Sequence, residues 1–174
     1  MKEPTDENLM LKVANGDLDL LKILFERHHI HVCNFLYKMC GDKMLSEDLT
    51  QDVFYKVMKY RTSYNSGRFV AWLFTIARNS LNTHFSRVKE HHENIDVVGY
   101  KLMEEREEKN EDHSHLQKAL DQLGASDKEL LVLNRFQEIK YQELAEIVGS
   151  TPGAVKTKVS RALKKLRLIY FENI

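Results

Sequence analysis

The chain has 174 residues, enough for one compact domain or two small ones. Apolar residues make up 43% and charged residues 30%, a mixture that excludes a chain disordered throughout. The formal net charge is zero, but the charges are segregated: acidic residues dominate positions 90–112, whereas every charged residue from 152 to 167 is Lys or Arg. The neutral total therefore does not exclude a polyanionic partner for the C-terminal part.

The spacing of apolar and charged residues predicts an all-α fold. Leu and charged residues recur three and four apart, and only two prolines interrupt the chain. We expect two small helical domains, at 1–90 and 113–174, joined by a flexible acidic linker at 91–112. Within that linker, a solvated helix over 102–109 is the alternative. The predicted helices cover residues 7–14, 17–39, 47–61, 67–89, 114–122, 128–136, 141–148 and 152–171.

The cysteines and the clustered histidines do not form a recognisable metal or redox pattern. Cys33 and Cys40 lie seven apart in an apolar helical pattern, which favours small core residues over ligands or reactive thiols. His28, His29 and His31 point to different faces of a helix, so no metal site is predicted. Without a leader, or an apolar run of about 18 residues, a cytoplasmic protein that needs no cofactor is expected.

Residues 47–54, EDLTQDVF, are predicted to open an amphipathic helix with Ser46 as its N-cap. Acids in the first turn suit the helix macrodipole. Leu49, Val53 and Val57 would face inward and leave an acidic, polar surface that suits a protein partner better than DNA. An ordinary capped helix without a partner is the alternative. The displayed residues would be Glu47, Asp48, Gln51, Asp52 and Tyr55.

Residues 69–79, FVAWLFTIARN, predict a helix with an aromatic core stripe and a weakly basic polar stripe. The polar stripe, which continues through Asn82, Ser86 and Lys89, could lie along nucleic acid. The preceding segment 64–68, YNSGR, offers an aromatic ring, an amide and a cation, groups that suit an unstacked base. By composition alone this segment is simply a loop.

The C-terminal part has the spacing of a helix-turn-helix. Ala145 is a small residue where two helices would cross, Gly149 can adopt positive φ in the turn, and Val155 anchors the second helix. Thr151 suits the N-cap and Pro152 the first helical position. A basic stripe alone would indicate only a solvated surface, but together with this turn it predicts a helix that enters the major groove.

Together, segments 47–54, 69–79, 149–158 and 161–163 resemble the extracytoplasmic-function class of sigma factors, and the resemblance spans nearly the whole chain. It implies a non-catalytic subunit that binds core RNA polymerase and directs promoter recognition, promoter melting and transcription initiation. It also implies regulation by an anti-sigma factor, of a kind that is often anchored in the membrane.

The resemblance also implies three sets of binding residues. The set for core polymerase, which would dock on the clamp helices of the largest subunit, is Asp48, Gln51, Asp52 and Phe54. The set for the minus-ten element is Tyr64, Asn65, Arg68, Arg78, Asn79, Asn82 and Arg87. The set for the minus-thirty-five duplex, in the domain that would also meet the polymerase flap, is Gly153, Lys156, Thr157, Ser160, Arg161 and Lys164.

Three positions depart from the family pattern. Thr83 stands where an aspartate is usual, Ala154 where a threonine is usual and Lys158 where an arginine is common. These departures leave the class intact but leave the promoter sequence open, because lysine replaces a planar fork with a point charge.

Two other classes of protein compete with this interpretation. One is a regulator with a ligand-sensing bundle that binds operator DNA by itself, usually as a dimer. The other is a metal or redox enzyme built on Cys33, Cys40 and the histidines, and no spacing supports its set of ligands or catalytic groups.

Overall fold

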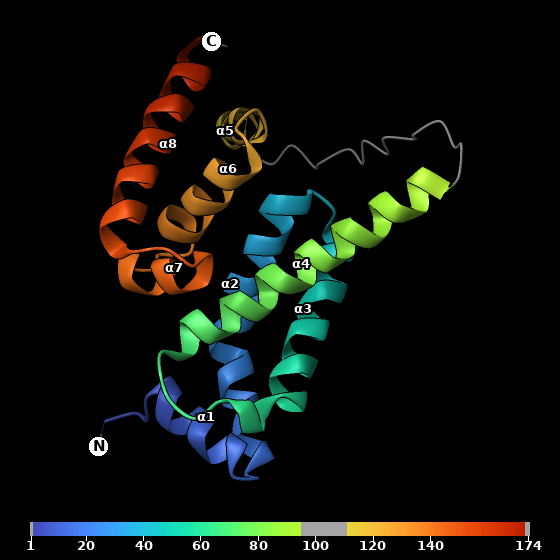
Figure 1. Cartoon of the computed structure of the whole chain (residues 1–174), viewed down its shortest axis with the longest axis vertical. Helices are drawn as coiled ribbons and strands as arrows, with labels where there is room; N and C mark the ends of the chain where they lie inside the picture. Colours follow the sequence, from blue (N-terminus) through green and yellow to red (C-terminus); the bar gives the residue numbers. More distant parts are fainter. Residues whose placement is uncertain (1, 95–110, 173–174) are drawn as a thin grey trace.

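The computed structural model describes residues 2–94 and 111–172, which fold into helices without a strand in those ranges (Figure 1). The predicted all-α class is therefore confirmed. Most of the predicted acidic linker, residues 95–110, lies outside the described residues. Within the described ranges, no helix combines the length and the apolar character needed to cross a bilayer.

The N-terminal domain is a bundle in which α2, α3 and α4 pack on one another and α1 covers one end. Its core contains Phe35 and Phe74, whose fully buried rings meet edge to face at 5.9 Å. Gly41, with φ of 71°, ends α2 in the left-handed conformation that glycine adopts without strain. The elements are α1 (Asp6–Ala14), η1 (Leu18–Leu20), α2 (Leu21–Cys40), α3 (Lys43–Lys59), η2 (Arg61–Ser63) and α4 (Phe69–Asn94).

The start of α3 differs from the prediction. Asp42 is the N-cap and its carboxylate accepts a hydrogen bond of 3.0 Å from the Leu45 amide, so the helix begins at Lys43 rather than at 47. Ser46 is buried inside the helix, where its hydroxyl donates to the Lys43 carbonyl at 2.7 Å. The predicted Ser46 cap was wrong because Asp42, an equally good cap, directly follows the glycine that ends α2.

The C-terminal domain is a helix-turn-helix, α7 and α8, supported by the preceding helices. A π-helical turn, η3, follows α6 and carries a hydrogen bond of 3.1 Å from the Gln137 amide to the Val132 carbonyl. Gly149 has φ of 68° in the turn, as its position predicts. The elements are α5 (Glu111–Asp121), α6 (Ala125–Leu131), η3 (Val132–Phe136), α7 (Tyr141–Val148) and α8 (Pro152–Glu172).

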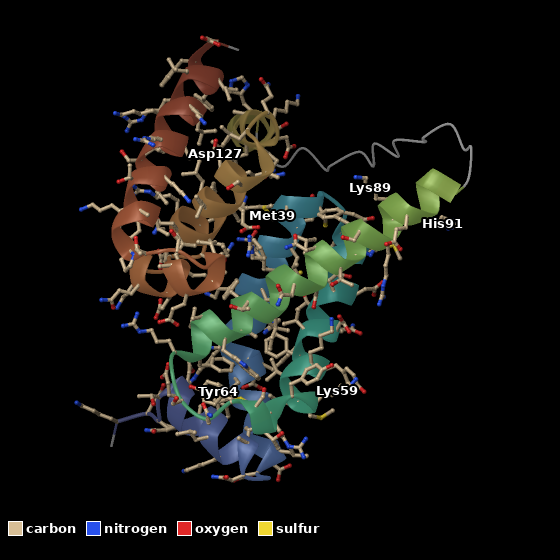
Figure 2. All side chains as sticks on the ribbon, viewed as in Figure 1. Met39, Lys59, Tyr64, Lys89, His91 and Asp127 are labelled. Carbon is tan, nitrogen blue, oxygen red and sulfur yellow. The ribbon has the colours of Figure 1, made fainter. Side chains whose placement is uncertain are left out.

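The two domains pack against each other through α4 and α7, with α4 crossing the middle of the molecule (Figure 1). Polar groups form much of this contact. Lys128 Nζ donates to the Met39 carbonyl at 3.4 Å near the C-terminal end of α2 (Figure 2), and Lys38 Nζ lies 4.3 Å from the centre of the Phe136 ring. The domain interface thus combines polar contacts with buried apolar side chains that belong to one continuous cluster.

Candidate nucleic-acid interface

Helix α8 is held by one buried face. Thr151 Oγ1 accepts a hydrogen bond of 3.2 Å from the Ala154 amide, as expected of an N-cap, and Pro152 begins the helix. The buried residues, which recur at three- and four-residue spacing, are Val155, Val159, Ala162 and Leu166. Their burial fixes which side of α8 faces solvent.

The exposed side of α8 carries every residue predicted for the duplex. Near its N-terminal end the side chains are small: a Cβ added at Gly153 would meet nothing within 4 Å, and the Thr157 hydroxyl donates to the Gly153 carbonyl at 3.1 Å. Cations follow further along, and no acid lies on α8 before Glu172. This arrangement allows close approach at one end and phosphate contact at the other. The exposed residues are Gly153, Lys156, Thr157, Ser160, Arg161 and Lys164.

The polar stripe of α4 is divided between solvent and the second domain. Asn79, Asn82 and Arg87 are exposed. Arg78, in contrast, donates from Nε to Glu129 Oε1 of α6 at 2.7 Å, and its Nη1 lies 3.5 Å from the Ile147 carbonyl of α7. Burial raises the pKa of the Glu129 carboxyl above its ordinary value, and the Arg78 charge opposes that shift.

The loop before α4 is held at its start by a buried ring. Tyr64 is only 3% exposed, and its hydroxyl donates to the Gly67 carbonyl at 2.7 Å. Burial, followed by the nearby charges of Glu7 and Asp6, raises the pKa of Tyr64 to about 12. In this conformation the Tyr64 ring is buried and its hydroxyl is engaged, so the expected contact of Tyr64 with a base stays a prediction that would require the ring to leave this position.

The other two residues predicted from this loop remain near the surface. Asn65 is exposed, and Arg68 is half-buried because its Nη2 donates to Gln142 Oε1 of α7 at 2.5 Å. Arg68 and Arg78 thus both bind the C-terminal domain, a relationship between distant segments that no local pattern indicates.

The exposed face of α3 is acidic, as predicted. Asp48 and Gln51 are exposed, and Asp52 forms an ion pair of 2.8 Å with Lys56 one turn later. Phe54, however, is only 6% exposed and packs edge to face on Phe25 of α2 at 4.9 Å. The ring therefore lies beneath the exposed face of α3, and the docking role expected for Phe54 stays a prediction.

Tyr55 is the aromatic residue that this face of α3 displays. Its side chain is 55% exposed, next to the buried Phe54. The helical pattern placed Tyr55 among the displayed residues without giving it a role. A large exposed ring one turn after Gln51 and Asp52 is typical of a contact residue, and the sequence contained this signal.

The cysteines and the clustered histidines have contacts of their own within the fold. Cys33 and Cys40 are half-buried thiols, and burial raises the pKa of Cys40. The three histidines have separate partners: His28 Nε2 donates to Asp6 Oδ2 at 2.7 Å, His29 Nδ1 to the Phe25 carbonyl at 2.8 Å, and His31 Nδ1 lies 3.1 Å from Gln137 Oε1. In the part of the chain that the structure describes, no three metal-ligating side chains gather.

Comparisons with solved structures show the same fold. The chain superposes on CnrH, solved in complex with the cytosolic domain of CnrY, with a TM-score of 0.77 over 97% of this chain and 99% of that one, at 19% identity. It superposes on the sigma factor RpoE from Bartonella quintana, solved with the anti-sigma factor NepR, with a TM-score of 0.72 over 85% and 94% of the two chains, at 24% identity.

Comparisons of sequence identify the family. Residues 24–90 match the model of sigma-70 region 2, and residues 114–166 match that of sigma-70 region 4. The chain is 31% identical to the RNA polymerase sigma factor CarQ of Myxococcus xanthus over 91% of this chain and 93% of that protein. It is 25% identical to the ECF RNA polymerase sigma factor SigM of Bacillus subtilis, over 84% and 93%. The chain belongs to the sigma-70 family, in its extracytoplasmic-function group, and is an alternative sigma factor that directs RNA polymerase to promoters.

Proposed function

We propose that the chain docks on core polymerase through α3, opens and holds the minus-ten element with α4 and the loop before it, and binds the minus-thirty-five duplex with α8. The exposed face of α8 carries this proposal, because its small and hydroxyl-bearing end leads into cations without an intervening acid. The chain performs no catalysis of its own and supplies recognition to the polymerase.

On α8 the exposed residues divide into two kinds of contact. Thr157, Ser160 and Arg161 follow the open N-terminal turn and would meet base edges in the major groove. Lys156 and Lys164 would bind phosphates on either side of the groove. Lys165 belongs to neither set, because its Nζ forms an ion pair of 3.0 Å with Asp127 of the same domain.

For the minus-ten element, the exposed Asn65, Asn79, Asn82 and Arg87 would contact the unpaired strand directly. Arg68 and Arg78 would join them only after release from Gln142 and Glu129. We therefore include domain separation in the proposal: the described arrangement is a closed form, and binding to polymerase opens it.

The composition of the interface supports separation. Glu129 is a largely buried carboxylate whose charged form is disfavoured by burial. Gln137, also at the interface, is buried with its Nε2 lacking a hydrogen-bond partner. Water would satisfy both groups in an open form, so closure does not gain as much free energy as the contact area suggests.

On α3, Asp48, Gln51, Asp52 and Tyr55 would form the surface for the clamp helices of the polymerase, supported from beneath by Phe54. An acidic face suits a basic protein surface and repels DNA, so it separates this role from those of α4 and α8. The contact of the C-terminal domain with the polymerase flap remains part of the same proposal.

We also propose that an anti-sigma factor regulates the chain. The similar sigma factor RpoE of Bartonella quintana was solved with its anti-sigma factor NepR, and CnrH was solved with the cytosolic domain of CnrY. A membrane-anchored regulator would hold the chain in the closed form until a signal releases it.

An in vitro transcription assay tests the proposal. It combines core polymerase, this chain and a promoter that the holoenzyme has selected from a DNA library. We expect transcripts only when core and chain are both present, and weak or no specific duplex binding by the chain alone. Tight, specific duplex binding without core, combined with no transcripts in its presence, would show that the chain acts as a self-sufficient regulator.

A further inference from the structure

Helix α1 contacts the first residue of α4 through a carboxylate. Glu7 Oε1 accepts a hydrogen bond of 3.1 Å from the backbone amide of Phe69, 62 residues away in the chain. Phe69 begins α4, and its amide has no partner within the helix because the first turn of any helix leaves such amides unpaired. Glu7 thus caps a helix other than its own and adds a negative charge at the positive end of the α4 dipole.

The segment held by this contact is the loop at 64–68. At its start, the buried Tyr64 ring packs against Trp72 at 5.3 Å, and the Tyr64 hydroxyl binds the Gly67 carbonyl. Gly67 has φ of 95°, a conformation that favours glycine. At the end of the loop, Phe69 is fully buried and its amide is bound by Glu7. Between these two anchors, Asn65 is left exposed and Arg68 lies at the rim.

Glu7 is itself held in place by the residue before it. Asp6 accepts hydrogen bonds from Arg27 Nη1 at 2.9 Å and from His28 Nε2 at 2.7 Å, both on α2. The His28 ring lies 5.4 Å from that of Phe69. This network ties the first turn of α1 to α2 and leaves Glu7 aimed at the start of α4. Figure 2 shows Tyr64 beside α1, at the end of the bundle where these contacts gather.

We infer that Glu7 is a positioning residue for minus-ten recognition: it fixes the first turn of α4 so that Asn65, and Arg68 once it is released from Gln142, are presented to the unpaired strand. The inference rests on the proposed role of the loop. Glu7 is half-buried, and its negative charge would repel a phosphate, so it acts through the Phe69 amide and not by touching DNA.

Three variants of the full chain, each assembled with core polymerase, test this role. Glu7→Ala removes the acceptor, Glu7→Gln keeps an oxygen for the Phe69 amide, and Glu3→Ala removes an exposed acid whose carboxylate lies 3.6 Å from Arg27. The readout is promoter opening, followed by a fluorescent base analogue in the minus-ten element. We expect Glu7→Ala to reduce opening about five- to tenfold, the range for a lost helix cap, Glu7→Gln to recover most of it and Glu3→Ala to match the parent.

Two controls separate positioning from general destabilisation. Val13→Ala opens a cavity in the buried face of α1 and lowers thermal stability without touching the Glu7 contact. Val13→Ala should lose as much thermal stability as Glu7→Ala or more. Its promoter opening should nevertheless be reduced far less. Affinity for core polymerase and binding of the minus-thirty-five duplex should stay unchanged in all variants, because Glu7 contacts the start of α4 and not the residues proposed for those roles on α3 and α8.

The titration of Tyr64 gives an independent check of the geometry. Its pKa is raised to about 12, partly by the Glu7 charge, so Glu7→Gln should lower the pKa of this tyrosine in ultraviolet absorbance titrations against Tyr64→Phe. If Asn65→Ala impairs promoter opening but Glu7→Ala does not, the positioning role of Glu7 is overturned and the assignment of the loop is kept. Normal opening by Asn65→Ala and Arg68→Ala as well would overturn the loop assignment and this inference with it.

Discussion

Arg78 of α4 and Glu129 of α6 form an ion pair of 2.7 Å that joins the two domains, although 51 residues separate them in the chain. The guanidinium is one of the groups proposed to bind the minus-ten strand, and in this arrangement its Nε is engaged by the carboxylate. If Arg78 binds DNA as proposed, this pair would compete with that binding in the closed form.

Reversing the charge of Glu129 should open the molecule. In Glu129→Lys, an ammonium group faces the Arg78 guanidinium, and like charges at this distance disfavour the closed form. We expect a larger radius of gyration in small-angle scattering, with unchanged helical content by circular dichroism. Asp127→Lys on the same helix is the matched control, because Asp127 pairs with Lys165 within its own domain. Equal radii for Glu129→Lys and the parent would contradict a role of this pair in closure.

Acidification should favour closure. Burial raises the pKa of Glu129 in the closed form above its ordinary value of 4.5, and we expect domain opening to expose the carboxyl to water and lower its pKa again. The closed form therefore binds this proton more tightly, so closure strengthens as pH falls through the raised pKa and weakens as pH rises above it. Scattering measured as a function of pH checks this sign. Glu129→Gln should remove the dependence, and an unchanged dependence in that variant would assign the effect to another group.

Arg161 should matter for duplex recognition and not for docking. If Arg161 reads a base, Arg161→Ala should weaken binding of a minus-thirty-five duplex by about 1–3 kcal/mol while affinity for core polymerase is kept. Lys118→Ala changes an exposed lysine on α5 of the same domain and should leave duplex binding unaltered. Fluorescence anisotropy at several salt concentrations distinguishes base reading from phosphate contact, because loss of a phosphate contact alone lowers the salt dependence for every sequence.

Asp6 should contribute stability that acid removes. The hydrogen bond from His28, together with that from Arg27, lowers the pKa of Asp6 below its ordinary 3.8, so the native carboxylate binds a proton less tightly than the unfolded one. Its contribution is present above pH 3.8 and is lost as pH falls through the lowered pKa. Asp6→Asn should reduce the free energy of unfolding by about 1–2 kcal/mol at neutral pH, measured by urea unfolding. Glu26→Gln, at an exposed pair of 3.9 Å with Lys22, should change it little.

Local signals predicted the helix-turn-helix well. Gly149, Thr151 and Pro152 each have a conformational preference that the turn satisfies, so α7 ends and α8 begins at the predicted residues. The start of α3 was less certain because Asp42 and Ser46 are both good caps four residues apart. Only the left-handed Gly41 next to Asp42 decides between them.

Burial of single aromatic residues was harder to predict. Phe54 and Tyr55 are neighbours on α3, but Phe54 is buried and Tyr55 is exposed. The difference depends on Phe25 of α2, which covers the Phe54 ring. Tyr64 is drawn inward by Trp72 and by the Gly67 carbonyl. Contacts between distant segments, such as those of Glu7 and Arg78, have no period or spacing that a single sequence reveals.

The pairing of Arg68 and Arg78 with the second domain also affects how strongly the free sigma factor binds nonspecific DNA between initiation events. A cell offers far more random DNA than promoters, and cations that are free to meet phosphates attract a protein to all of it. With both arginines engaged by Gln142 and Glu129, the closed chain presents fewer such cations. It would consequently remain available to polymerase in solution instead of being sequestered on the chromosome.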